Sequence, residues 1–120
     1  MLALICSFIS CSATPLQSLS VKDFEQKLQQ TSTPQLVDVR MPQEYVEAHL
    51  VAAVNIDVKA GNFREEIEKL DKARPVFVYC RSGARSKTAA NILLKAGFKE
   101  VYDLDKGINA WREAGKPVEK

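Results

Sequence analysis

The stretch from Val76 to Ser86 constrains the fold of this chain most, because a buried strand leads there into a helix. Val76-Phe-Val-Tyr79 is a short apolar run of β-branched and aromatic residues, which is typical of a strand buried on both faces. The pattern after Ser86 is helical, with polar and apolar residues on opposite sides. Strands of this kind occur in parallel sheets that are covered by helices. Cys80 therefore lies at the carboxyl end of a strand.

Strands and helices alternate along the rest of the chain. This alternation predicts one α/β domain with a mainly parallel central sheet of about five short strands and with helices on both faces. Sheets of this class carry their sites beyond the carboxyl ends of the strands, where Cys80 is expected. The predicted strands are residues 35–40, 53–56, 76–79 and 100–104, and the predicted helices are residues 21–30, 42–48, 63–70, 86–96 and 108–114.

Length and composition agree with a single domain, which we place at residues 19–120. The chain has 120 residues, of which 46% are apolar and 27% charged, so it can supply and cover one core. The net charge of +2 is too small to favour nucleic acid or an anionic membrane as a partner. We expect a monomer.

Residues 1–18 differ from the rest and are interpreted as a leader. Leu2 to Ile9 is almost wholly apolar and small residues follow it, as in a signal peptide, while Phe8-Ile-Ser-Cys11 is similar to a lipoprotein box. The expected location is the periplasm, or a bacterial envelope membrane through a lipid anchor. No Lys or Arg precedes the apolar run, which leaves a disordered segment and a cytoplasmic location as the alternative. Cys6 and Cys11 lie in this leader, so Cys80 is the thiol of the domain.

The loop after Cys80 has the composition of an anion cradle. Gly83 is central, no proline interrupts the loop, and successive N–H groups can curl toward the sulfur before a helix begins. Such a nest at a helix N-terminus, with arginines beside it, lowers the pKa of a thiol from its usual value of about 8.5. Cys80 is therefore predicted to be a nucleophilic thiolate rather than a buried, inert cysteine. The predicted substrate-binding residues are Arg81, Ser82, Gly83, Ala84, Arg85 and Ser86.

Three segments of the chain resemble the rhodanese family of sulfurtransferases. The run from Cys80 to Ser86, read as CRSGARS, is similar to the family's active-site loop. Residues 36–56 are similar to its "DVR, EY, GHI, A-NI" segment, and residues 104–118 are similar to its "L-GG-W-GxPV" ending. Ala48, Val51 and Lys106 depart from this pattern at turns. The resemblance covers about residues 19–118 and implies that the protein carries a sulfane sulfur as a persulfide on Cys80.

The resemblance also implies roles for residues outside the loop. Asp38, Arg40 and Glu44 match family positions that support the active-site loop. His49 matches a histidine that is not catalytic, which agrees with the structural role that a single histidine before a strand commonly has. For Arg85 both substrate contact and an inward, bracing role stay open, with bracing favoured. No metal is expected, because no His, Cys or carboxylate set has ligand spacing, and no cofactor is expected beyond the covalent persulfide.

The expected reaction is transfer of the outer sulfur of thiosulfate, or of a related anionic donor, to a thiophilic acceptor. The acceptor is cyanide in an assay and a thiol, including a protein thiol, in a cell. A protein-to-protein persulfide carrier stays open as an alternative. A cysteine-dependent phosphatase or arsenate reductase is disfavoured, because those enzymes resemble CxxxxxR whereas Cys80 to Arg85 is CxxxxR. A binding module without chemistry is disfavoured by a cysteine flanked by two arginines.

Overall fold

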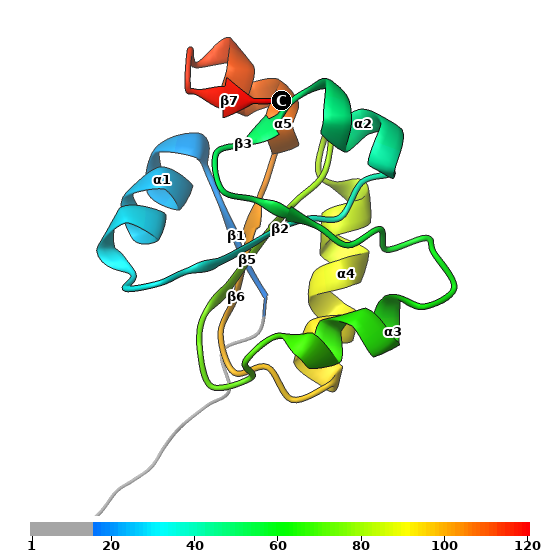
Figure 1. The fold of residues 1–120 in the computed structure, drawn as a ribbon. Coiled ribbons are helices and arrows are strands. Elements are labelled where there is room, and N and C mark those ends of the chain that lie inside the picture. The colour runs from blue at the N-terminus through cyan, green and yellow to red at the C-terminus, as the bar shows by residue number, and fades with distance from the viewer. Residues whose placement is uncertain (1–15) are drawn as a thin grey trace, which may run out of the picture.

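A computed structural model describes residues 16–120, which form one α/β domain (Figure 1). The central sheet has five parallel strands in the order β1-β6-β5-β2-β4, and β3 and β7 form a separate antiparallel pair. The strands are β1 (Gln17–Leu19), β2 (Gln35–Asp38), β3 (His49–Leu50), β4 (Val54–Asn55), β5 (Val76–Tyr79), β6 (Val101–Leu104) and β7 (Val118–Glu119). The helices are α1 (Val21–Gln30), α2 (Pro42–Glu47), α3 (Phe63–Glu66) with a 3₁₀ turn at Ile67–Lys69, α4 (Ala84–Lys95) and α5 (Gly107–Glu113).

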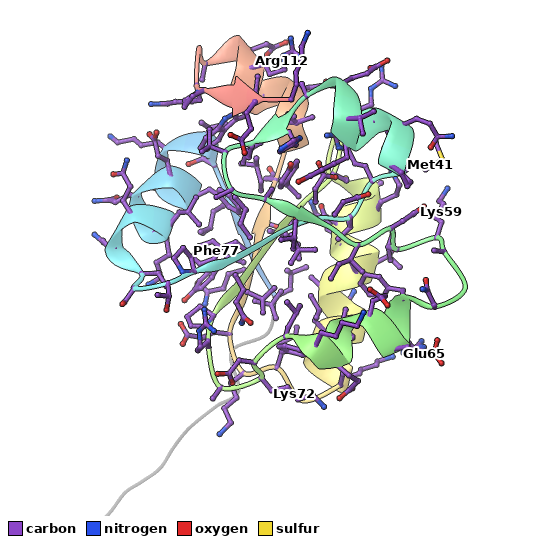
Figure 2. All side chains as sticks on the ribbon, viewed as in Figure 1. Met41, Lys59, Glu65, Lys72, Phe77 and Arg112 are labelled. Carbon is purple, nitrogen blue, oxygen red and sulfur yellow. The ribbon has the colours of Figure 1, made fainter. Side chains whose placement is uncertain are left out.

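The two faces of the sheet bury two separate apolar clusters, and the alternation along β5 divides them. Val76 and Val78 point with Cys80 toward α3 and α4, whereas Phe77 and Tyr79 point toward α1 and α5. Figure 1 shows α1 on one side of the sheet and α3 with α4 on the other. Figure 2 shows side chains filling both layers, and the ring of Phe77 packs edge-on against Phe24 of α1 at 5.5 Å. Burial on both faces explains why β5 is apolar at every position.

The predicted fold class is confirmed, and most elements lie where periodicity placed them. α1 spans the expected ten residues and begins at Ser20, whose hydroxyl accepts the N–H of Asp23 at 3.2 Å. α4 begins at Ala84, two residues before the predicted start, because Gly83 is already its N-cap. Asn62 is the N-cap residue of α3, but its side chain makes no capping hydrogen bond to that helix.

Three short strands were not predicted. β1 pairs in parallel with β6, so Gln17 and Ser18, which we assigned to the leader, belong to the sheet. β3 and β7 pair His49 with Glu119 and Leu50 with Val118. The signal-peptide and lipoprotein interpretations fall on residues 1–15, outside the described part of the chain. Among residues 16–120, no helix has both the length and the apolar character needed to cross a bilayer.

Candidate active site

Cys80 follows the last residue of β5, at the carboxyl edge of the sheet, and is 1% exposed. Its Sγ accepts the backbone N–H of Gly83 at 3.1 Å and lies 3.5 Å from Oγ of Ser86. The chain between these residues therefore turns back around the sulfur before α4 begins. This arrangement aims hydrogen-bond donors at a group that becomes negatively charged when the thiol ionises.

The surroundings of Cys80 lower its pKa. Burial acts in the opposite direction, because it disfavours the charged thiolate. Hydrogen bonds from the Ser86 side chain and from the backbone N–H groups of Ser86, Gly83 and Ser82 outweigh burial, so the pKa of the Cys80 thiol lies below that of an ordinary cysteine. A lowered pKa gives this buried cysteine a larger thiolate fraction than an ordinary cysteine has at the same pH.

Two glycines allow the loop to take this shape. Gly83 has φ of +118°, and a Cβ there would collide with the backbone carbonyl of Asp105. Gly107 has φ of +65°, and a Cβ there would collide with the backbone of Cys80 and Arg81. The close approach at Gly107 lets the N–H of Ile108 donate to the carbonyl of Cys80 at 2.9 Å. The N–H of Asn109 donates likewise to the carbonyl of Arg81 at 3.1 Å, so the start of α5 holds the start of the loop.

Arg85 is held by a carboxylate from another helix. Its guanidinium makes two hydrogen bonds to Glu44 of α2, with Nη1 to Oε1 at 2.7 Å and Nη2 to Oε2 at 3.0 Å. The hydrogen bond from Arg85 lowers the pKa of Glu44 to about 2, against the opposing effect of burial, and the N–H of Met41 adds to the lowering. Both side chains are about one-fifth exposed. Arg85 therefore braces the loop against α2.

A buried network lies next to the loop at the ends of β2 and β5. Asp38 is fully buried and accepts hydrogen bonds from Arg40, with Nη2 to Oδ2 at 2.7 Å, and from the hydroxyl of Tyr79 at 2.6 Å. Arg40 also donates to the carbonyl of Ala48 at 2.6 Å, and the Tyr79 hydroxyl accepts the N–H of Leu50 at 3.0 Å. Burial and the charge of Asp38 raise the pKa of Tyr79, so this hydroxyl stays protonated. The network fixes the residue that precedes Cys80.

Comparison with known proteins identifies the family of this domain. The family model of the rhodanese-like domain matches residues 20–114. The chain belongs to the rhodanese-like domain family. A protein named thiosulfate sulfurtransferase GlpE from Coxiella burnetii is 39% identical over 77 residues, which cover 64% of this chain and 70% of that protein. The protein of the same name from Vibrio cholerae is 34% identical over 94 residues, covering 78% and 87%.

A relative of a different name also matches the rhodanese-like domain. A putative sulfur carrier protein, YrkF from Bacillus subtilis, is 30% identical over 100 residues, which are 83% of this chain and 53% of that protein. This chain thus spans about half the length of YrkF. Among solved structures, a rhodanese-related protein from Thermoplasma volcanium superposes with a TM-score of 0.75 at 27% identity, covering 86% of this chain and 97% of that one.

The structure of this rhodanese-like domain separates the predicted site residues into three groups. Gly83 and Ser86 are buried beside Sγ, whereas Arg81, Ser82 and Ala84 are exposed. Arg85 and Glu44 form one ion pair, and Asp38 and Arg40 form another. Arg81 lines a cleft of about 240 Å³ together with Arg112 of α5, which Figure 2 labels, and with Glu47. His49 stacks on Tyr45 at 3.8 Å and lies 3.5 Å from Glu119.

Two of the three departures from the family pattern, Ala48 and Lys106, have a local explanation. Ala48 has φ of −170°, which is extended backbone that any residue adopts. Lys106 has φ of −104°, so this turn does not need a glycine there, whereas the next residue, Gly107, does. Sequence analysis missed Gly107 and Asp103 as parts of the site. The signal for Asp103 was a carboxylate in the middle of the buried strand Val101–Leu104, where a charge needs a partner.

Proposed function

We propose that this rhodanese-like domain is a transferase that moves a sulfane sulfur from a small anionic donor, such as thiosulfate, to a thiophilic acceptor through a persulfide on Cys80. The observation that carries this proposal is the ring of donors around Sγ, with the N–H of Gly83 at 3.1 Å and α4 beginning at the next residue. A helix N-terminus adds positive potential to these N–H groups. The names of the Coxiella and Vibrio relatives support the same reaction class.

The first half-reaction loads the cysteine. The Cys80 thiolate attacks the outer sulfur of thiosulfate, a new sulfur–sulfur bond forms, and the bond inside thiosulfate breaks. Sulfite leaves with that electron pair, and the enzyme retains Cys80-S-S⁻. The loop N–H groups stabilise the terminal sulfur as an oxyanion hole stabilises developing charge, where one such donor is worth about 3–4 kcal/mol.

The second half-reaction removes the sulfur from Cys80. Cyanide or a thiolate attacks the terminal sulfur, the sulfur–sulfur bond of the persulfide breaks, and Cys80 leaves as the thiolate that began the cycle. The products are thiocyanate or a new persulfide. Atoms and electrons balance without a cofactor, which agrees with a ping-pong scheme.

The arginines have different tasks in this scheme. Arg81 is exposed at the mouth of the loop and lines the cleft, so it is the residue that we assign to the anionic end of the donor. Arg85 donates two hydrogen bonds to Glu44 and holds the loop against α2. Ser82, Gly83 and Ser86 contribute backbone N–H groups toward Sγ.

The test is the intact mass of the purified protein before and after thiosulfate. We expect an added mass of about 32 Da, one sulfur atom, that cyanide removes. Cys80→Ser should show none, whereas Cys6→Ser with Cys11→Ser should load as the wild type does if these residues are retained. A wild-type protein that gains no sulfur from thiosulfate or polysulfide refutes the proposal.

The same mass spectrum gives the observed N-terminus, which tests our proposal that the leader is cleaved or acylated for export.

The name of the Bacillus relative favours a second candidate, a carrier that exchanges persulfide with other proteins. A carrier loads Cys80 from a protein persulfide faster than from thiosulfate, and it turns over slowly with cyanide. Single-turnover loading from the two donors, measured side by side, separates the candidates. Faster loading from thiosulfate with rapid thiocyanate release supports the enzyme.

A further inference from the structure

Asp103 places a carboxylate directly behind the Cys80 site. It lies in the middle of β6 and is fully buried. Its Oδ1 accepts a hydrogen bond from the hydroxyl of Ser86. Its Oδ2 accepts hydrogen bonds from the hydroxyl of Ser18 at 2.9 Å and from the ammonium of Lys87 at 3.1 Å. A buried carboxylate with these three donors is fully satisfied only while the Ser86 hydroxyl points at it.

Ser86 has one hydroxyl proton and three acceptors within reach. Besides Asp103, these are the carbonyl of Gly83 at 3.2 Å and Sγ of Cys80 at 3.5 Å. The charged carboxylate is the strongest acceptor, so the proton lies on the Asp103 side. The lone pairs of Ser86 Oγ then face Sγ and accept the S–H of the protonated thiol. Cys80, Ser86 and Asp103 form one chain of hydrogen bonds.

We propose that Asp103 is a positioning residue of the active site, which holds the hydroxyl proton of Ser86 and releases it to Sγ only when Cys80 is ionised. A thiolate has no proton to donate, so it is stabilised by Ser86 only after the hydroxyl turns from Oδ1 to Sγ. Asp103 resists this rotation, since Oδ1 then loses its donor. The carboxylate thus limits how strongly the pocket stabilises the thiolate.

This inference rests on the proposed function and explains a property that sulfur transfer needs. An attacking thiolate loses nucleophilicity as its basicity falls, so a thiolate stabilised too well attacks slowly. After loading, the charge sits on the terminal sulfur and Sγ becomes a neutral disulfide-type atom. The Ser86 hydroxyl then turns back to Asp103. The buried carboxylate regains this hydrogen bond, which favours the loaded state.

Other charged groups lie next to the hydrogen bonds that join Cys80, Ser86 and Asp103. Lys87 of α4 bridges Asp103 and Asp105, and Arg85 of the same helix lies close enough for its positive charge to be stabilised by the Cys80 thiolate. Asp105 is 43% exposed and contacts Lys87 with its carboxylate but is not bonded to Ser86. Asp105→Asn therefore offers a control in which Lys87 loses one carboxylate partner but the Ser86 hydroxyl keeps its acceptor.

Asp103→Asn tests the proposal through the direction of one hydrogen bond. Lys87 can only donate, so the amide oxygen must face Lys87 and the amide NH₂ must face Ser86. The NH₂ donates to Ser86 Oγ, and the hydroxyl proton is free for the thiolate. Since a hydrogen bond to a charged group is worth about a tenfold change in an equilibrium, we expect the thiolate fraction at pH below the midpoint to rise about tenfold. Ultraviolet absorbance of the thiolate against pH measures it.

The controls separate hydrogen-bond direction from charge. Asp105→Asn should raise the thiolate fraction at most about twofold, because its exposed charge is screened. In a Ser86→Ala background, Asp103→Asn should lose most of its effect. The proposal is overturned if the folded Asp103→Asn protein titrates as the wild type does, if Asp105→Asn has an equal effect, or if the effect persists without the Ser86 hydroxyl. These titrations need no sulfur donor, so their outcome is independent of whether the protein transfers sulfur.

A second variant covers the case in which Asp103→Asn does not fold. Lys87 is 41% exposed, and Lys87→Met leaves Asp103 more dependent on the Ser86 proton. The thiolate fraction at pH below the midpoint should fall several-fold, and this fall should shrink when Ser86→Ala is added. An equal fall in both backgrounds assigns the effect to lost positive charge and overturns the proposal.

Discussion

Arg85 and Glu44, which lie 41 positions apart in the sequence, form a two-point ion pair that ties the first turn of α4 to the first turn of α2. The pair joins two of the helices that begin at the carboxyl edge of the sheet, α2 after β2 and α4 after β5. In the sequence alone, Arg85 was a candidate for substrate contact, whereas in the structure its guanidinium is hydrogen-bonded to Glu44. Loop shape therefore depends on a helix that carries none of the loop's residues.

Glu44→Gln should lower the free energy of unfolding at neutral pH by about 2 kcal/mol, because a partly buried bidentate pair loses its charge. In the wild type the Glu44 pKa of about 2 lies below the unfolded value of about 4.3, so the contribution is complete above pH of about 4.3 and is lost as the pH falls toward about 2. Urea unfolding of both proteins across this range measures it. The difference between them should vanish at the acidic end.

Glu66→Gln is the matched control for this prediction. Glu66 pairs with Lys69 at 3.0 Å, but both side chains are much more exposed, at 36% and 74%. The change should cost less than about 0.5 kcal/mol. If both glutamine variants are equally destabilised, the special role of the Arg85 pair is refuted.

Gly107→Ala should disturb the active-site loop from behind. The added Cβ collides with the backbone of Cys80 and Arg81, and φ of +65° is unfavourable for alanine. We expect a loss of more than about 2 kcal/mol in unfolding free energy and much slower sulfur loading of Cys80. Gly115→Ala isolates the backbone cost, because φ is +74° and the added Cβ meets nothing within 4 Å. It should lose about 1 kcal/mol and load normally; normal loading by Gly107→Ala would contradict the assigned role.

Tyr79→Phe should destabilise the fold through the network beside the loop. The change removes the donor to Asp38 and leaves the buried N–H of Leu50 without its acceptor. A loss of about 1–3 kcal/mol in urea unfolding is expected. Tyr45→Phe removes a single hydrogen bond to the carbonyl of Ala53 from a half-buried site and should cost less. Equal losses would mean that the Asp38 contact contributes nothing beyond an ordinary hydrogen bond.

Alkylation of Cys80 by iodoacetamide should be half-maximal at a pH below about 8.5, the value for a free cysteine, because loop N–H groups and Ser86 stabilise the thiolate. In concentrated urea the midpoint should return to about 8.5, since these donors disperse. The pH dependence of the alkylation rate measures both. An unchanged midpoint on unfolding would show that the fold does not activate the thiol.

The elements that sequence predicted well are those whose signal is local. β5 is an uninterrupted apolar run, and α1 has a cap and helical periodicity within ten residues. The strands that were missed are two or three residues long and carry no such pattern. β1 is a strand only because β6 lies beside it, and β3 exists only because β7 returns to pair with it. Pairing between distant short segments is a property of the folded chain.

The sequence by itself determined that a cysteine follows a buried strand and that a glycine-containing loop leads from it into a helix, because periodicity and backbone freedom act over a few neighbouring residues. Only the tertiary structure decided which partners that loop meets. Glu44 takes the guanidinium of Arg85, and Asp103 takes the hydroxyl of Ser86. The physical reason is that parallel pairing brings the carboxyl ends of β2, β5 and β6 to one edge of the sheet, where side chains from distant segments compete for the same hydrogen bonds.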